Sequence, residues 1–136
     1  MYEQVNPRQE MATYATQVVE TLFRNMAYEI RKTLDKPDEE SIHDLRVNCL
    51  RLRHAVRLFG ELFPARRGRK IRRRLGDLQQ MLADVRNCDI ALQVLNLEPV
   101  AGAVSQRTRR RLANELALER RRALRPLRAR LRKMQR

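Results

Sequence analysis

The feature that most constrains this chain is a hydrophobic seam whose members alternate between steps of four and three residues. The seam consists of Leu45, Cys49, Leu52, Val56, Phe59 and Phe63. Because an α-helix completes one turn in about 3.6 residues, this spacing places the seam along a single stripe of one helix. A stripe of this kind is typical of long helices that pack side by side in antiparallel bundles.

Apolar residues at helical spacing recur along most of the chain and predict four long helices without an internal repeat. The helices are expected over residues 8–34, 38–63 and 69–97 and from residue 105 onward. The chain has 43% hydrophobic residues but only four glycines and five prolines, which favours helix and suffices for one core. We therefore predict an all-α fold, an antiparallel four-helix bundle in a single domain over residues 1–136.

Prolines and glycines mark the expected ends of the first three helices. The residue before Pro37 is driven out of the helical region, and Pro37 with the acids that follow it makes a good helix start. Pro64 and Gly68 predict a short loop, and residues 96–104 form the longest predicted loop.

The fourth helix is expected to begin with Ser105 as its N-cap. Pro126 lies inside this helix and should kink or divide it, because proline removes a backbone donor and clashes with the preceding turn. Residues 127–136 are therefore expected to form a mobile basic tail.

Arginine dominates the charge of the chain. Lysine and arginine number 30 against 16 acids, for a formal net charge of +14. Residues 1–40 carry a slight excess of acids, whereas residues 105–136 carry thirteen bases and two acids. Such an excess repels itself unless a counter-charge is nearby, and arginine makes bidentate contacts with phosphate oxygens. The composition therefore points to a polyanionic partner, with the first helix structural and binding left to the rest of the chain.

The second predicted helix places cations nearly opposite its hydrophobic seam. This face carries His43, Arg46, Arg53 and Arg57, with His54 beside them. They extend over about 20 Å of helix at 1.5 Å per residue. Asp44 is the only acid between Ser41 and Gly60, whereas a solvated face ordinarily mixes both signs of charge. The pattern favours a rail of cations that lines a basic surface groove and follows a linear anion.

Two stretches of the sequence resemble the CHAD family, the conserved histidine α-helical domain. The first is SIHDLRVNCLRLRHAVRLF over residues 41–59, which is similar to the family pattern H-x-x-R-V-x-x-R-R-x-R at His43, Arg46, Val47, Arg51 and Arg53. The second is LADVRNCDI over residues 82–90, which is similar to L-G-x-x-R-D-x-D-V at Leu82, Arg86 and Asp89. The departures from the family's usual residues are Leu50, Gly76, Ala83 and Asn87.

The resemblance extends over all four predicted helices and implies that the chain binds inorganic polyphosphate. The residues themselves offer no catalytic arrangement, so we expect neither an enzyme nor a cofactor. The phosphate contacts that it implies are His43, Arg46, Arg51, Arg53, Arg57 and Arg86. We add Arg72 from helix geometry, because the spacing places it on the same face of the third helix as Arg86. Asp89 is expected to pair with an arginine and hold it in position, and the alternative is an exposed acid at a frayed turn.

A usual CHAD domain has two such four-helix units around a basic channel, so the resemblance covers about half of one. It implies either a homodimer that completes a two-walled channel or a one-sided groove with weaker binding. The resemblance implies association with polyphosphate granules. We expect a cytoplasmic protein, because no apolar run reaches the roughly 18 residues that a membrane span needs. Cys49 and Cys88 fit no metal or redox spacing and are interpreted as buried residues in a reducing compartment.

Catalytic and metal-binding functions find little support in the sequence. The dipeptide His43-Asp44 suggests a metal-dependent phosphohydrolase, but His54 is the only other histidine and lies on the same predicted helix. The sequence shows no glycine-rich phosphate loop and no arrangement typical of nucleophilic catalysis. We expect no metal site.

Two other binding functions stay open at this point. The main alternative is a nucleic-acid-binding protein without sequence preference, in which the arginine-rich residues 105–136 contact the phosphate backbone. A basic helix over residues 107–136 that lies on a membrane surface or binds a partner is the third possibility. Competition between polyphosphate and duplex DNA at matched salt separates these classes.

Overall fold

The computed structural model describes residues 6–135 and is built from helices alone within that range. Its α-helices are α1 (Pro7–Asp35), α2 (Glu39–Leu58), α3 (Ala65–Leu95), the short α4 (Glu98–Ala103) and α5 (Gln106–Met134), with a 3-10 turn, η1 (Gly60–Leu62), between α2 and α3. The all-α fold predicted from the sequence is confirmed.

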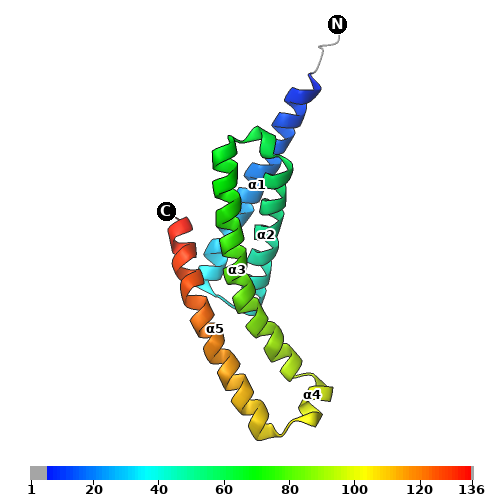
Figure 1. The fold of residues 1–136 in the computed structure, drawn as a ribbon, viewed down its shortest axis with the longest axis vertical. Coiled ribbons are helices and arrows are strands. Elements are labelled where there is room, and N and C mark those ends of the chain that lie inside the picture. The colour runs from blue at the N-terminus through cyan, green and yellow to red at the C-terminus, as the bar shows by residue number, and fades with distance from the viewer. Residues whose placement is uncertain (1–5, 136) are drawn as a thin grey trace.

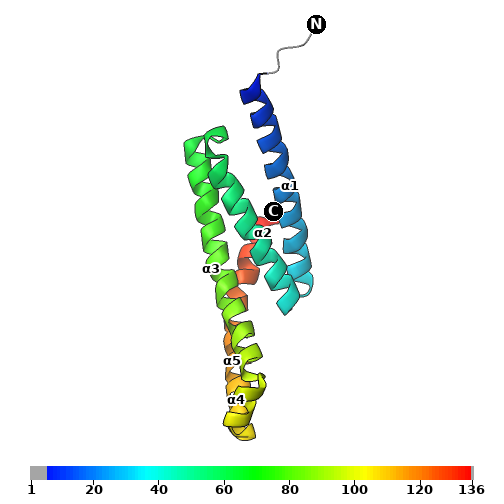
Figure 2. The same ribbon diagram turned by 90° about the vertical axis from the view of Figure 1, so that its right-hand side faces the viewer.

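The four long helices run alternately up and down, so each packs against its neighbour in the chain in an antiparallel direction (Figure 1). Helix α2 lies between α1 and α3, while α5 packs against α3 and over a short stretch against α1. The helices are staggered: the last part of α3 and the first part of α5 extend below the other two as a pair joined by α4 (Figures 1 and 2). Helix α5 therefore ends beside the middle of the bundle and does not reach its upper end.

Local capping sets most helix ends where the sequence predicts them. Lys36, the residue before Pro37, is extended with φ −141° and ψ 94°, and it ends α1. Asp38 caps α2, because its Oδ1 accepts a hydrogen bond of 2.9 Å from the backbone N–H of Ser41. Ser105 caps α5 as expected, and its Oγ accepts from the Thr108 N–H at 3.2 Å.

The connection between α2 and α3 differs from the prediction. Helix α2 ends at Leu58 and not at residue 63, because Phe59 leaves the helical region before Gly60 and Phe63 is extended ahead of Pro64. Helix α3 then begins at Ala65, four residues earlier than predicted. Gly68, expected in the loop, is helical, and its N–H donates to the Pro64 carbonyl at 3.0 Å. The predicted loop at 96–104 contains α4.

Two expectations for the end of the chain, a helix divided at Pro126 and a mobile tail, are wrong over residues 127–134. Helix α5 continues through Pro126, and Leu127 and Leu131 are fully buried instead of forming a mobile tail. A proline inside a helix costs about 3 kcal/mol, while burying a leucine contributes roughly 1.5–3 kcal/mol. The two leucines together offset the proline, so tertiary packing holds the helix in one piece. Arg136 of the predicted tail lies outside the described residues.

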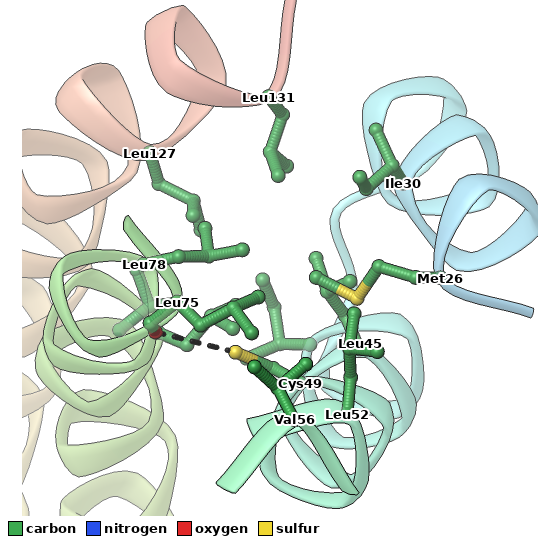
Figure 3. Close-up of a cluster of buried hydrophobic side chains, with 13 residues drawn as sticks. Met26, Ile30, Leu45, Cys49, Leu52, Val56, Leu75, Leu78, Leu127 and Leu131 are labelled. Carbon is green, nitrogen blue, oxygen red and sulfur yellow. Dashed lines mark hydrogen bonds between the residues drawn. The ribbon is translucent and has the colours of Figure 1, made fainter. Parts of the chain in front are cut away.

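The core lies where α1, α2, α3 and the end of α5 meet (Figure 3). Its buried members are Met26, Ile30, Ile42, Leu45, Cys49, Leu52, Val56, Leu75, Leu78, Leu82, Val85, Leu127 and Leu131. The first four positions of the predicted seam, Leu45 to Val56, are buried, whereas Phe59 and Phe63 are half-buried beyond the end of α2. This packing turns the opposite, arginine-bearing side of α2 outward.

Candidate functional site

A hollow of about 510 Å³ lies between α2 and the start of α3, and most of its lining is cationic. Its walls are formed by Leu50, Arg53, His54, Arg57, Arg69, Arg72 and Arg73, which we call the arginine trough. Because α2 and α3 are antiparallel, the last turns of α2 face the first turns of α3. Five arginines from two helices thus line one open space.

One hydrogen bond and a glycine place Arg53 against α3. The Nη1 of Arg53 donates a hydrogen bond of 2.7 Å to the Gln79 Oε1 on α3. A Cβ built on Gly76 would lie 3.6 Å from the Arg53 Nη2, so the guanidinium lies directly over this glycine. A long basic side chain at position 76, which the family resemblance leads one to expect, would compete with Arg53 for this space. The glycine therefore accounts for how Arg53 reaches α3.

The described residues that line the trough include no counter-charge. No carboxylate is among the residues that line it in the described part of the chain. Within residues 6–135, none of its arginines takes part in an ion pair with an aspartate or glutamate. The first turn of α3 also lacks acids, and a helix N-terminus carries a partial positive charge. The positive potential is left for an external anion to neutralise.

The predicted site residues divide between this trough and two other places. Arg53, Arg57 and Arg72 come together in the trough. Arg46 is exposed and precedes Arg53 by seven residues, about 10 Å along α2, so it extends the same face away from the trough. Arg51 is also exposed. It precedes Arg53 by two residues, which turn a helix by about 200°, so Arg51 lies on a different side of α2 from Arg53 and does not join the trough.

His43 and Arg86 lie at the far end of α2 in an acidic setting. They line a shallow hollow of about 390 Å³ together with Glu39 and Glu40. The Arg86 Nη1 is 3.2 Å from the Glu39 Oε1, and Gln93 Nε2 donates to the same oxygen. Since Glu39 neutralises Arg86, this end of α2 has less positive charge to offer an anion than the trough has.

Three residues of the trough were not among the predicted site residues. Arg69 and Arg73 were not singled out, and His54 was noted only as lying beside the cationic face of the second helix. The signal for the two arginines was the dense basic run over residues 66–74, which the predicted loop partly concealed. Once α3 begins at Ala65, these residues occupy its second and third turns, level with the end of α2.

Asp89 forms the arginine pair that the sequence predicted. The carboxylate is 6% exposed, and its Oδ1 accepts from the Arg120 Nε at 2.7 Å. The Arg120 Nη2 donates to the Pro37 carbonyl at 2.9 Å, which ties α3, α5 and the connection between α1 and α2 together. We call this set of contacts the Asp89–Arg120 clasp. Its arginine lies outside the trough, so the pair has a structural role.

The remaining ionisable groups near α2 are structural as well. The Lys32 Nζ of α1 donates to the Asp44 Oδ2 at 2.7 Å, and this hydrogen bond and the Glu29 carboxylate, 3.0 Å from the same Nζ, raise the pKa of Lys32 above its ordinary value. Burial raises the pKa of the Cys49 thiol to about 11, and its Sγ donates to the Leu75 carbonyl at 3.4 Å (Figure 3). Among the described residues, no group of three or more His, Cys, Asp or Glu is placed to hold a metal ion.

Comparison with known proteins identifies one family. The model of the CHAD domain matches residues 17–135. No curated protein and no solved structure matches the chain. None of the helices in residues 6–135 is both long and apolar enough to cross a bilayer.

Proposed function

Because this chain belongs to the CHAD domain family, we propose that it binds inorganic polyphosphate in the arginine trough between α2 and α3. The family is in general one of polyphosphate-binding domains. One observation carries the proposal: five arginines and His54 converge on one open hollow. The described residues that line this hollow include no carboxylate.

The chemistry of the trough suits this ligand. Polyphosphate is a flexible chain with about one charge per monomer, and guanidinium groups bind phosphate oxygens in a bidentate manner. Single-stranded nucleic acids are usually bound by stacking their bases on aromatic rings. Within the described residues the lining contains Leu50 and His54 besides the five arginines, and neither phenylalanine, tyrosine nor tryptophan contributes to it. A linear anion without bases therefore fits the trough best.

The same lining supports binding without hydrolysis. The CHAD domain is a binding domain and not generally catalytic. Attack of water on a phosphoryl group is ordinarily assisted by a general base or a metal ion, and the described lining of the trough contains no carboxylate and only His54 as a candidate base. We place Arg53, Arg57 and Arg72 at the centre of the site, with Arg46 as its extension along α2.

The proposed trough is one-sided, so part of a bound chain faces solvent. A second copy of the protein that closed over it would give a two-walled channel and tighter binding. Light scattering with and without polyphosphate distinguishes the two arrangements, since a channel shared by two copies requires a dimer of defined mass. Association with polyphosphate granules in the cytoplasm would follow from the same contacts.

The test is a titration of labelled long-chain polyphosphate and of duplex DNA at equal phosphate concentration and matched salt. The informative variant is Arg53→Ala/Arg57→Ala, and Arg107→Ala/Arg110→Ala on α5 is the control with the same loss of charge outside the trough. An exposed arginine–phosphate contact contributes roughly 1 kcal/mol after screening, so losing two weakens polyphosphate binding about thirtyfold.

The salt dependence provides a second readout. The slope of log K against log salt is about −0.7 for each phosphate contact of a single-stranded polyanion, so the slope of the trough variant should be less negative by about 1.4. Equal affinity for DNA and polyphosphate, lowered only by the α5 control variant, would contradict the proposal. That outcome would assign the chain to nucleic-acid binding through α5.

A further inference from the structure

A second hollow, of about 550 Å³, opens between α1 and α3, where α5 comes to its end. Its apolar lining includes Phe23 and Ala27 of α1, Ile71 of α3 and Met134 in the last turn of α5. We call this hollow the apolar groove. It lies beyond the last turn of α5, alongside α1 and the first half of α3.

The groove exposes apolar surface that a helix in this position would cover. Phe23 is 42% exposed, although its neighbours Met26 and Ile30 on α1 are buried in the core. Ala27 is exposed and small, which leaves room for a side chain of an incoming helix. Helical segments that lay an apolar stripe into a groove of this type form a common mode of protein recognition.

The rim of the groove is basic. Arg31 of α1, Arg74 of α3 and Lys133 of α5 all line it, and no acid does so within the described residues. Arg67 and Lys70 precede Arg74 by seven and four residues, so helical spacing places them on the same face of α3 above the end of α5. An occupant with carboxylates beside its apolar stripe would neutralise this charge.

We propose that the apolar groove is a docking site for an acidic amphipathic helix of a partner protein. The lining of α1 extends from Phe23 to Arg31, about 12 Å at 1.5 Å per residue, which corresponds to two to three turns of the incoming helix. Its apolar side chains would cover Phe23 and Ile71, and its glutamates or aspartates would meet Arg74 and Lys133.

Two other occupants fit the groove less well. A second copy of this chain carries the same net charge of +14, so its approach to a basic rim is opposed electrostatically. Polyphosphate has no apolar surface to cover Phe23 or Ile71. The groove and the arginine trough share no lining residue in the described part of the chain, so the two sites can be tested separately.

The test uses three labelled synthetic peptides of 18 residues, a length of about five turns that allows for fraying at both ends. The first has a leucine stripe flanked by glutamates, the second has the same stripe flanked by lysines, and the third is a scrambled version of the first without a stripe. Fluorescence anisotropy with the full chain measures binding. We expect saturable binding of the first peptide and at least tenfold weaker binding of the other two.

Protein variants then locate the binding. Arg74→Glu, an exposed position, should weaken the glutamate peptide about tenfold and strengthen the lysine peptide, while Phe23→Ser should weaken both. Arg53→Ala/Arg57→Ala should leave peptide binding unchanged while it lowers polyphosphate binding, so failure of one proposal is distinguishable from failure of the other. Circular dichroism confirms that each variant is folded.

Three results would overturn the docking site. The first is equal binding of the scrambled peptide, which would mean that charge alone attracts it. The second is a loss of peptide binding in the trough variant but not in Arg74→Glu. The third is a protein dimer that forms without peptide, is weakened by Phe23→Ser and does not dissociate when the glutamate peptide is added.

Discussion

The Asp89–Arg120 clasp allows a sharp test of what holds α3, α5 and the connection between α1 and α2 together. Replacing Arg120 by alanine removes the 2.7 Å contact with the Asp89 carboxylate and the 2.9 Å hydrogen bond with the Pro37 carbonyl. The carboxylate is 6% exposed and would be left as a buried charge without its cation. Breaking a buried ion pair in this way typically costs about 3–5 kcal/mol. Domains of this size are stable by roughly 5–15 kcal/mol, so the variant should lose a large part of its stability.

Urea unfolding followed by circular dichroism measures this loss. With a slope of about 2 kcal/mol per molar urea, the midpoint of Arg120→Ala should fall by roughly 1.5–2.5 M. The control is Arg111→Ala, which breaks the exposed pair between Arg111 and Glu115 on the same helix, with side chains 81% and 60% exposed. An exposed pair of this kind contributes about 0.3–0.5 kcal/mol, so the control midpoint should hardly move.

The double replacement Asp89→Leu/Arg120→Leu separates the cost of the unpaired charge from the value of the pair itself. The Asp89 Oδ2 has no hydrogen-bond partner in the described structure, so the carboxylate is only partly compensated. Replacing both members with apolar residues should therefore cost much less than either single change. If Arg120→Ala unfolds at the same urea concentration as Arg111→Ala, the clasp does not hold the bundle and the reasoning is refuted.

Two further predictions concern groups whose pKa the fold displaces. Burial raises the pKa of Cys49 to about 11 and that of Cys88 above its ordinary value. Both thiols should therefore be almost unreactive with Ellman's reagent in the native protein at pH 8 and should react fully in guanidinium. Rapid labelling of the native protein would contradict their burial. The hydrogen bond from the Ser41 N–H lowers the pKa of the Asp38 cap, so this carboxylate stabilises the fold above its unfolded pKa, and the contribution is lost as pH falls through the lower, folded pKa. Asp38→Ala should accordingly unfold at lower temperature than the unmodified protein at pH 7 and at nearly the same temperature in strong acid, and a difference in unfolding temperature that is independent of pH would disprove the cap's role.

The sequence alone determined those features that depend on neighbours within about one helical turn. The seam from Leu45 to Val56 predicted which side of α2 is buried, and Lys36, Asp38 and Ser105 ended or capped helices as expected. Periodicity and capping involve residues three or four positions apart, so they can be recognised without knowing the fold. The resemblance to the family rests on motifs of the same short range.

Only the tertiary structure decided which charges meet. Arg53 and Arg57 face Arg69, Arg72 and Arg73 because α2 and α3 are antiparallel and in a particular register, which no local pattern specifies. No local feature of the sequence distinguishes Arg86 from the arginines of the trough, yet the fold pairs it with Glu39, 47 residues away. Helix α5 continues through Pro126 because Leu127 and Leu131 are buried by other helices. Pairing, burial and the direction of an arginine on its helix all depend on what the neighbouring helix presents, and that is settled only when the helices pack.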